Sequence, residues 1–303
     1  MKPVVQILGP TGSGKTQAAL AAARALGGEI ISADSVQVYR GFDIGSGKAT
    51  PEERREVPHH LIDIIADCAQ FNASRFLELA HAAAEDIGSR GRLAIVCGGT
   101  ALYLRVMIQG LFPEGRVVSR EQLEQEAAAR GWEALYRDLE GSDPAYARKI
   151  SVNDHVRLLR ALEIQRNSGL PPSAAFRLSR SPFAGSPFIR VGLHVERAEL
   201  YRAIDARVER MLACGLIEET RRLLESHPPS CPPFRSLGYK EALAHLRGEI
   251  SRDEARELIQ RHSRQFAKRQ LTWFRQEKDV CWFPATDHEA IVGHIRACLS
   301  SAR

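Results

Sequence analysis

The sequence lacks the features of several specialised protein classes. No apolar run reaches the roughly 18 residues that a membrane-spanning helix needs. The cysteines, at positions 68, 97, 214, 231, 281 and 298, show no C-x-x-C spacing, so neither a zinc site nor a disulfide framework is expected. An apolar segment begins at Val4, without the pattern of a secretory signal before it. We therefore expect a cytoplasmic protein without membrane contact, and a monomer.

The composition is that of an ordinary globular protein. The chain has 303 residues, of which 44% are hydrophobic and 26% charged. This length supports one large core, or a core with a smaller second domain. The formal net charge of +5 favours an acidic partner without identifying it.

Residues 9–16 form the most informative stretch, which we call the phosphate loop. They fit the pattern G-x-x-x-x-G-K-[ST], between an apolar strand-like run at 4–8 and an alanine-rich helical stretch at 16–26. Backbone N–H groups would surround a phosphate, Lys15 would pair with its outer oxygens, and Thr16 could ligate Mg²⁺. A diphosphate or triphosphate site is predicted, with ATP as the default ligand, over a glycine-rich turn without one. The loop comprises Gly9, Pro10, Thr11, Gly12, Ser13, Gly14, Lys15 and Thr16.

The chain alternates strand-like and helical patterns, which predicts an α/β fold with a parallel, doubly wound sheet around the phosphate loop. Strands are expected near 29–32, 58–65, 92–97 and 188–195, and helices near 71–90, 200–214, 217–226, 239–246 and 252–277. Helical patterns at 119–169, followed by a proline- and serine-rich stretch, indicate a helical insertion over 111–186. The catalytic core would comprise 1–110 and 187–303.

Three segments that follow strands should meet at one edge of this sheet: the phosphate loop, Asp34, and residues 98–100. Asp34 could act as general base on an acceptor nucleophile, although an aspartate that caps the next turn is the alternative. Ser35, Gln37 and Tyr39 add groups suited to a flat polar acceptor. The strand at 92–97 ends in Cys97 and two glycines, without the acid of many nucleoside triphosphatases. This favours a small kinase or another group transferase.

A basic segment at 261–275 carries five Lys/Arg residues and no acid. On a helix, Arg261, Arg264, Lys268 and Arg275 would share one face, and Phe266 and Trp273 would lie together on another side. Such a surface suits a phosphodiester backbone with stackable bases, while a solvated face with a buried aromatic stripe is the alternative. A second basic cluster lies at 153–160, so a nucleic-acid acceptor is favoured over a small metabolite.

Taken in order, these segments resemble the tRNA dimethylallyltransferase (tRNA isopentenyltransferase) family, and the resemblance covers nearly the whole chain. The matching segments are 9–16, 31–39, 43–45, 58–63, 98–100, 153–163, 237–241 and 268–275. The resemblance implies transfer of a dimethylallyl group from its diphosphate to the exocyclic amine of the adenine just 3′ of the tRNA anticodon, with Mg²⁺ as cofactor. The adenine would be flipped into the pocket.

The resemblance also implies roles for particular residues. Asp34 matches the general base, while Thr11 and Arg120 match contacts to the diphosphate near the breaking bond; Arg116 is the alternative to Arg120. The loop N–H groups, Lys15 and Mg²⁺ would stabilise the departing diphosphate. The positions that match tRNA contacts are Asp34, Ser35, Val36, Gln37, Thr100, Arg120, Val156, Arg157, Leu158, Leu159, Arg160, Arg235, Ser236, Leu237, Gly238, Tyr239, Lys240, Lys268, Arg269, Gln270, Leu271, Thr272, Trp273, Phe274 and Arg275.

Three other functions remain open at this stage. An adenylate isopentenyltransferase would use free AMP or ADP as acceptor, but would need neither the basic segment nor the insertion. A small-molecule kinase would bind ATP in the phosphate loop. A non-catalytic RNA-binding module is disfavoured by Asp34 beside that loop.

Overall fold

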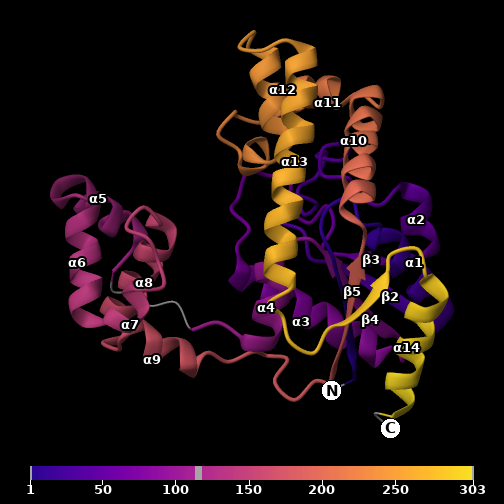
Figure 1. The fold of residues 1–303 in the computed structure, drawn as a ribbon, viewed down its shortest axis with the longest axis horizontal. Helices are drawn as coiled ribbons and strands as arrows, with labels where there is room; N and C mark the ends of the chain where they lie inside the picture. Colours follow the sequence, from indigo (N-terminus) through magenta and orange to yellow (C-terminus); the bar gives the residue numbers. More distant parts are fainter. Residues whose placement is uncertain (1, 113–117, 302–303) are drawn as a thin grey trace. The chain divides into compact units, whose positions relative to one another are not determined.

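The structure is a computed structural model that describes residues 2–112 and 118–301 (Figure 1). It divides into two compact units, which we describe separately. One comprises the residues up to Arg105 and those from Gly185 onward, and the other is Val106–Ala184. The sequence placed these boundaries after residues 110 and 186.

The first unit is built on a parallel sheet. Within the described residues, six strands pair in the order β3-β2-β4-β1-β5-β6, and every pair is parallel. The predicted parallel α/β fold is therefore confirmed, although the edge strand β6 was not predicted. The strands are β1 (Val4–Leu8), β2 (Gly28–Ser32), β3 (His59–His60), β4 (Leu93–Gly98), β5 (Phe188–His194) and β6 (Cys281–Pro284).

Helices cover both faces of the sheet, so its central strands are buried on both sides. Val5 and Ile7 of β1 pack in one core with α1 and α14, whereas Gln6, between them in sequence, donates to the carbonyl oxygen of Leu104 in α4. The sequence predicted neither α14 nor α4. The helices of this unit are α1 (Lys15–Leu26), α2 (Pro51–Glu56), α3 (Ala73–Ser89), α4 (Ala101–Gln109, which runs into the second unit), α10 (Arg197–Ala213), α11 (Leu216–Ser226), the short η2 (Pro232–Arg235), α12 (Tyr239–Leu246), α13 (Arg252–Phe274) and α14 (His288–Ser301).

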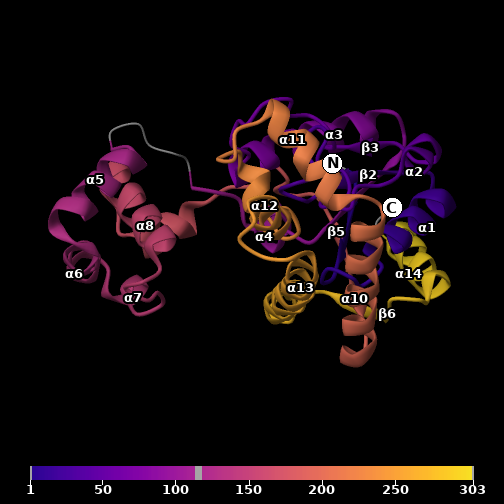
Figure 2. The ribbon, with the colours of Figure 1, turned by 90° about the horizontal axis from the view of Figure 1, so that it is seen from above.

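A second apolar core joins the segment after β2 to α10–α13. Phe42 lies at its centre, with its ring edge-on to those of Tyr39, Phe234 and Tyr239. Helices α10 and α13 run side by side next to this core (Figure 2). The core therefore holds residues 34–48, which we call the acceptor loop, against the C-terminal helices.

The second unit is helical, as the sequence predicted. Its core is formed by apolar side chains such as Leu123, Leu139 and Leu158. The amphipathic spacing of these residues, and capping residues such as Ser119 and Asp154, explain where the helices begin. The elements are α5 (Arg120–Arg130), α6 (Trp132–Ser142), α7 (Pro144–Ala147), α8 (His155–Ser168), α9 (Pro172–Ala175) and the short η1 (Phe176–Leu178).

One sequence expectation is wrong. Cys68 and Cys231 form a disulfide, with Cα atoms 5.0 Å apart and a sequence separation of 163 residues. Spacing rules detect neighbouring cysteines, whereas this pair is brought together by packing of the segment after β3 against η2. Cys97, Cys214, Cys281 and Cys298 are free thiols. None of the described helices combines the length and the apolar character that crossing a membrane requires.

Candidate active site

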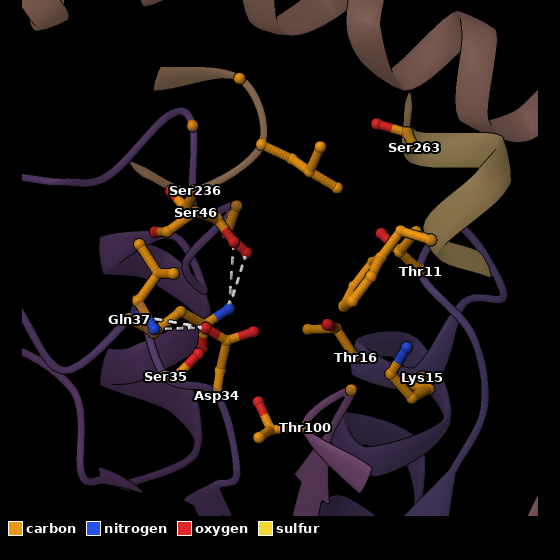
Figure 3. A pocket seen from close by; sticks show the side chains of 18 of the residues that line it. Thr11, Lys15, Thr16, Asp34, Ser35, Gln37, Ser46, Thr100, Ser236 and Ser263 are labelled. Carbon is orange, nitrogen blue, oxygen red and sulfur yellow. Dashed lines mark hydrogen bonds between the residues drawn. The ribbon is translucent and has the colours of Figure 1, made fainter. Parts of the chain in front are cut away.

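A cavity of about 460 Å³ lies in the first unit, beyond the carboxyl ends of β1, β2 and β4 (Figure 3). Asp34 and Gln37 lie on one side of it, and Thr11, Lys15 and Thr16 on the other. The three segments that were expected to converge therefore line one cavity. Helices α10 and α13 and the segment 235–240 complete the wall.

The phosphate loop has the conformation that its glycines permit. Gly12 and Gly14 have φ angles of 80° and 79°, in the left-handed region that favours glycine. The Ser13 N–H donates to the Pro10 carbonyl oxygen at 3.2 Å, and the buried Ser13 hydroxyl has no hydrogen-bond partner among the described residues. Because α1 starts directly after Gly14 without a side-chain cap, its first N–H groups are available to an anion.

Lys15 is half-buried beside this loop. Its Nζ donates to the Pro10 carbonyl oxygen at 2.6 Å. Burial lowers the pKa of the ammonium to about 8, and the positive charge of Arg207 acts in the same direction. A bound phosphate would favour the protonated form of Lys15, because its negative charge stabilises the ammonium.

Arg207 of α10 is a cavity residue that the sequence analysis missed. Its guanidinium forms no hydrogen bond or ion pair with another described residue, and burial lowers its pKa while the charge of Asp34 raises it. An arginine stays charged under these conditions. Lys15 and Arg207 thus bring two cations to one cavity, which suits a ligand with two phosphate groups. No local pattern marks Arg207, since α10 carries other arginines on its exposed side.

Asp34 uses its two carboxylate oxygens differently. Oδ1 accepts the N–H groups of Val36 and Gln37 at 2.8 and 3.2 Å, so the turn-capping alternative is correct for this oxygen. Oδ2 accepts no hydrogen bond from the part of the chain that the structure describes. The turn fixes the carboxylate at the cavity wall and leaves one oxygen for a proton from a ligand.

The buried carboxylate of Glu219 joins two parts of the cavity wall. It accepts the Ile44 N–H at 3.0 Å and the Tyr239 hydroxyl at 2.6 Å, and the Gly45 N–H donates to that hydroxyl at 3.2 Å. Burial and the Glu219 charge raise the pKa of Tyr239, so its hydroxyl stays protonated. A Cβ at Gly45 would clash with the Tyr239 ring, so only glycine fits there.

Gln270 of α13 connects the phosphate loop to the segment after β4. Its Oε1 accepts the Thr11 N–H at 2.8 Å, and its Nε2 donates to the Gly99 carbonyl oxygen at 2.7 Å. The side chain is 5% exposed. Gln270 was predicted as a tRNA contact, but its side chain is used within the protein, where it holds two loops of the cavity in register.

The other predicted tRNA contacts of this unit fall into three groups. Cavity-lining residues are Asp34, Ser35, Val36, Gln37, Thr100, Arg235, Ser236, Leu237, Gly238, Lys240 and Arg269. The exposed residues are Lys268 and Thr272 on α13 and Arg275 directly after it, while Leu271 and Trp273 are half-buried and Tyr239 and Phe274 are buried. A buried side chain cannot contact an RNA, so at the buried positions only backbone atoms are available to it.

Helix α13 has a basic side and an aromatic side, as its spacing predicted. Arg261, Lys268 and Arg275 are exposed, but Arg264 forms an ion pair with Asp205 of α10. On the other side, Phe266 lines the cavity and the guanidinium of Arg105 lies 3.8 Å from the centroid of the Trp273 ring. The fold therefore uses part of the basic and aromatic pattern for internal contacts.

The remaining predicted site residues belong to the second unit. Arg120 is the first residue of α5, and its Nε donates to Glu124 at 3.1 Å. Val156 and Arg157 are exposed on α8, whereas Leu158 and Leu159 are buried. Arg160 donates to the carbonyl oxygen of Phe112 and to Glu163. Arg116 lies outside the described residues.

The residues fit a magnesium ion bound together with a phosphate ligand. The Thr16 hydroxyl lines the cavity, and Mg²⁺ prefers oxygen ligands, often one or two from the protein with the rest from phosphates and water. Among the described residues no cluster of three or more His, Cys, Asp or Glu side chains could hold a metal by itself. Such a site would therefore depend on the ligand.

Comparisons with known proteins agree with this geometry. The sequence matches the IPP transferase family over residues 37–277. It is 47% identical over 284 residues to the tRNA dimethylallyltransferase of Geobacter metallireducens, covering 92% of this chain and 91% of that protein. Identity to tRNA dimethylallyltransferase 1 of Trichlorobacter lovleyi is 45%, over 96% of this chain and 97% of that one.

Solved structures give the same result. The full-length tRNA isopentenylpyrophosphate transferase of Bacillus halodurans aligns with a TM-score of 0.73 and 38% identity, over 99% of this chain and 98% of that one. A eukaryotic dimethylallyltransferase acting on tRNA aligns with a TM-score of 0.83 and 30% identity, over 95% of this chain and 75% of that one. The family predicted from the sequence is thus confirmed: the chain belongs to the tRNA dimethylallyltransferases, or IPP transferases, and is a prenyltransferase with a phosphate-loop-like core.

Proposed function

We propose that this chain transfers the dimethylallyl group of dimethylallyl diphosphate to the exocyclic amine of the adenine just 3′ of the anticodon in tRNA. The observation that carries the proposal is that Asp34, with one carboxylate oxygen unused, lines the same cavity as Lys15 and Arg207. A proton acceptor and two cations across one cavity match a reaction in which an amine attacks and a diphosphate leaves.

The leaving diphosphate binds at the phosphate loop. Negative charge develops on its oxygens as the allylic C–O bond breaks, and preorganised N–H groups and cations stabilise that charge. Lys15, Arg207 and the first N–H groups of α1 supply this stabilisation, and Thr11 contacts the diphosphate near the breaking bond. Thr16 would hold a Mg²⁺ ion, which would neutralise further charge of the diphosphate.

The acceptor adenine enters from the side of Asp34. Its amine nitrogen forms the new bond to the allylic carbon as the C–O bond breaks, and the proton it loses passes to Oδ2 of Asp34. A base in a stacked loop cannot reach this oxygen, so the adenine leaves the stack first. Apolar cavity residues such as Ile204, Met211 and Phe266 exclude water from the reacting atoms.

The tRNA is held by exposed basic residues on both units. Lys268 and Arg269 of α13, and Arg275 directly after it, bind the phosphodiester backbone. Arg157 of α8 does so on the second unit. The role of Arg120 at the diphosphate stays a prediction from the resemblance; its ion pair with Glu124 is exposed and costs little to exchange. The buried residues of the predicted tRNA segments pack beneath these surfaces and do not contact the tRNA with their side chains.

Donor and acceptor competition tests this function. The protein is incubated with Mg²⁺, with dimethylallyl diphosphate or ATP as donor, and with an anticodon stem-loop or AMP as acceptor, and the products are weighed by mass spectrometry. We expect one prenyl group to be added to the stem-loop from dimethylallyl diphosphate. Prenylation of AMP alone would indicate an adenylate isopentenyltransferase, and phosphate transfer from ATP a kinase; either result would refute the proposal.

A further inference from the structure

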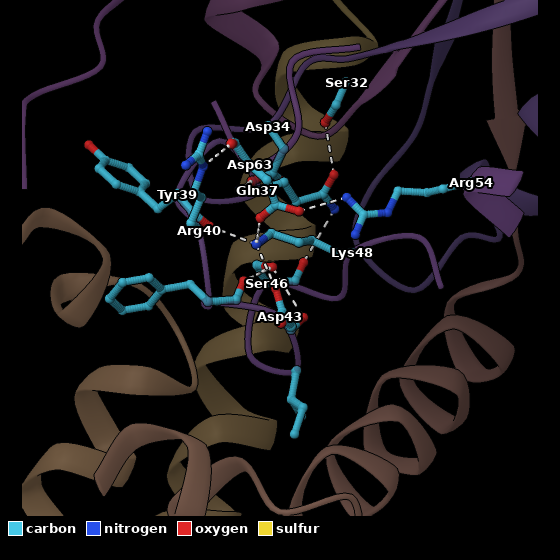
Figure 4. Close-up of polar contacts among 12 residues, drawn as sticks. Ser32, Asp34, Gln37, Tyr39, Arg40, Asp43, Ser46, Lys48, Arg54 and Asp63 are labelled. Carbon is cyan, nitrogen blue, oxygen red and sulfur yellow. Dashed lines mark hydrogen bonds and ion pairs between the residues drawn. The ribbon is translucent and has the colours of Figure 1, made fainter. Parts of the chain in front are cut away.

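Lys48 is a buried cation outside the cavity. Its side chain is 3% exposed, and its ammonium donates to the carbonyl oxygen of Tyr39 at 2.6 Å, to Asp43 at 2.7 Å and to Asp63 at 2.5 Å (Figure 4). A lysine ammonium has three hydrogens, so all of its donors are used. Lys48 therefore has no hydrogen left for a substrate, and its function must lie in what it joins.

The three partners of Lys48 come from two separate segments. Tyr39 and Asp43 belong to the acceptor loop, while Asp63 follows β3. Asp63 adopts a left-handed backbone with φ of 58°, and its N–H donates to the carbonyl oxygen of Gln37 at 3.1 Å. The carboxylate of Asp63 also accepts from Arg54 at 2.6 Å. Lys48 thus closes the acceptor loop on itself and fastens it to the segment after β3.

The same contacts lead directly to Asp34. Gln37 Nε2 donates to the carbonyl oxygen of Gly47, the neighbour of Lys48, at 3.2 Å, and Gln37 Oε1 accepts from Ser32 at 2.8 Å. The backbone N–H of Gln37 then donates to Oδ1 of Asp34. The Nε2 end of Gln37 is therefore fixed by Gly47, next to Lys48, and its carbonyl oxygen by Asp63, while Ser32 of β2 fixes Oε1. Gln37 in turn orients the carboxylate of Asp34 through its backbone N–H.

We propose that Lys48 is a positioning residue that sets the geometry of the acceptor side of the cavity. Its ammonium holds the acceptor loop so that Gln37 and the turn at Val36 orient the Asp34 carboxylate. This inference rests on the proposed function, in which Asp34 takes the proton of the acceptor amine. Stability alone does not require the lysine, because a buried ion pair is often replaced by apolar side chains without loss of stability.

The test compares Lys48→Met with Arg54→Met. Both variants remove a cation from Asp63, but the Arg54 side chain forms no hydrogen bond or ion pair with the acceptor loop in the part of the chain that the structure describes, so it is the matched control. Amide hydrogen exchange of residues 36–47 and steady-state kinetics, normalised to the folded fraction, are measured for both. We expect Lys48→Met to exchange about tenfold faster in this segment and to lose about 10²-fold in kcat. Its KM for dimethylallyl diphosphate should be unchanged, and Arg54→Met should match the wild type.

A double variant separates loss of loop positioning from the effect of leaving the Asp63 carboxylate without Lys48. Lys48→Met combined with Asp63→Asn removes both charges; positioning predicts that kcat stays low, because the bonds to Tyr39 and Asp43 are still missing. If Lys48→Met does not fold, Asp43→Ala removes one acceptor of Lys48 at a 56% exposed position and should give faster exchange in the same segment.

The inference is overturned if exchange at 36–47 is the same in Lys48→Met and Arg54→Met, or if the double variant regains full kcat. Wild-type exchange equal to that of Asp43→Ala would overturn it as well. The exchange measurements need no substrate. Absence of prenyl transfer by the wild type would therefore refute the proposed function, and only the exchange comparison decides whether Lys48 orders the loop.

Discussion

Binding of dimethylallyl diphosphate should weaken about tenfold when the pH is raised from about 7 to about 9. Burial lowers the pKa of Lys15 to about 8. A lysine with that pKa is about nine-tenths protonated at the lower pH and about one-tenth protonated at the higher one. The diphosphate binds to Lys15 in its charged ammonium form, so the affinity for dimethylallyl diphosphate falls as Lys15 loses its proton. The second phosphate pKa is about 6, so the charge of the ligand itself changes little in this range.

Isothermal titration calorimetry at constant Mg²⁺ concentration measures this effect, with Lys15→Arg as the matched control. A guanidinium stays protonated throughout the range, so this variant should show a flat affinity, whatever its absolute value. The neighbouring thiol of Cys97 does not interfere, because burial raises its pKa to about 11. A wild-type affinity that is independent of pH, or an equal slope in Lys15→Arg, would refute the role of Lys15.

Four variants test other parts of the site. Asp34→Asn keeps the turn but removes the base, so the rate should fall by at least about two powers of ten without a lower melting temperature; near-normal turnover would mean that Asp34 only caps the turn. Arg207→Met should weaken diphosphate binding at least about tenfold in calorimetry, the scale of a lost charged hydrogen bond, and unchanged binding would exclude contact. Tyr239→Phe removes the hydroxyl donor of the buried Glu219 carboxylate, which keeps only backbone N–H donors such as that of Ile44. It should lower the free energy of unfolding by about 1–3 kcal/mol in urea titrations; an unchanged midpoint would contradict this. Replacing Lys268 and Arg269 by alanine should weaken tRNA binding and reduce its salt dependence by about one unit of log–log slope per charge, with diphosphate binding intact; an unchanged salt slope would place them away from the RNA backbone.

The sequence predicted the parts of the site that follow from local patterns. Parallel strands bring the segments after their carboxyl ends to one edge, so the phosphate loop, Asp34 and Thr100 could be placed together before the structure was known. The spacing of α13 likewise predicted an exposed basic side with Lys268 and Arg275 on it. These predictions hold because they depend on strand direction and helical periodicity, which short segments determine.

The remaining features depend on contacts between distant segments. Gln270 meets Thr11 across 259 residues, and Glu219 meets Ile44 across 175. Nothing in the local spacing distinguishes such residues from others of their type on a helix surface. Arg207 likewise resembles the other arginines of α10 in sequence, and only the packing of that helix places it in the cavity. The disulfide between Cys68 and Cys231 also depends on contacts between distant segments. Packing, not pattern, assigns their roles.

The central claim is that Asp34 and the phosphate loop together prenylate an adenine amine in an RNA loop. The most direct test is to incubate the protein with dimethylallyl diphosphate, Mg²⁺ and two anticodon stem-loops that differ only at the base 3′ of the anticodon. One carries adenine there, and the other carries a purine without the exocyclic amine. Mass spectrometry of the digested RNA should find one prenyl group on that adenine and none on the second RNA. Prenylation of both RNAs, or of neither while AMP is modified, would contradict the account.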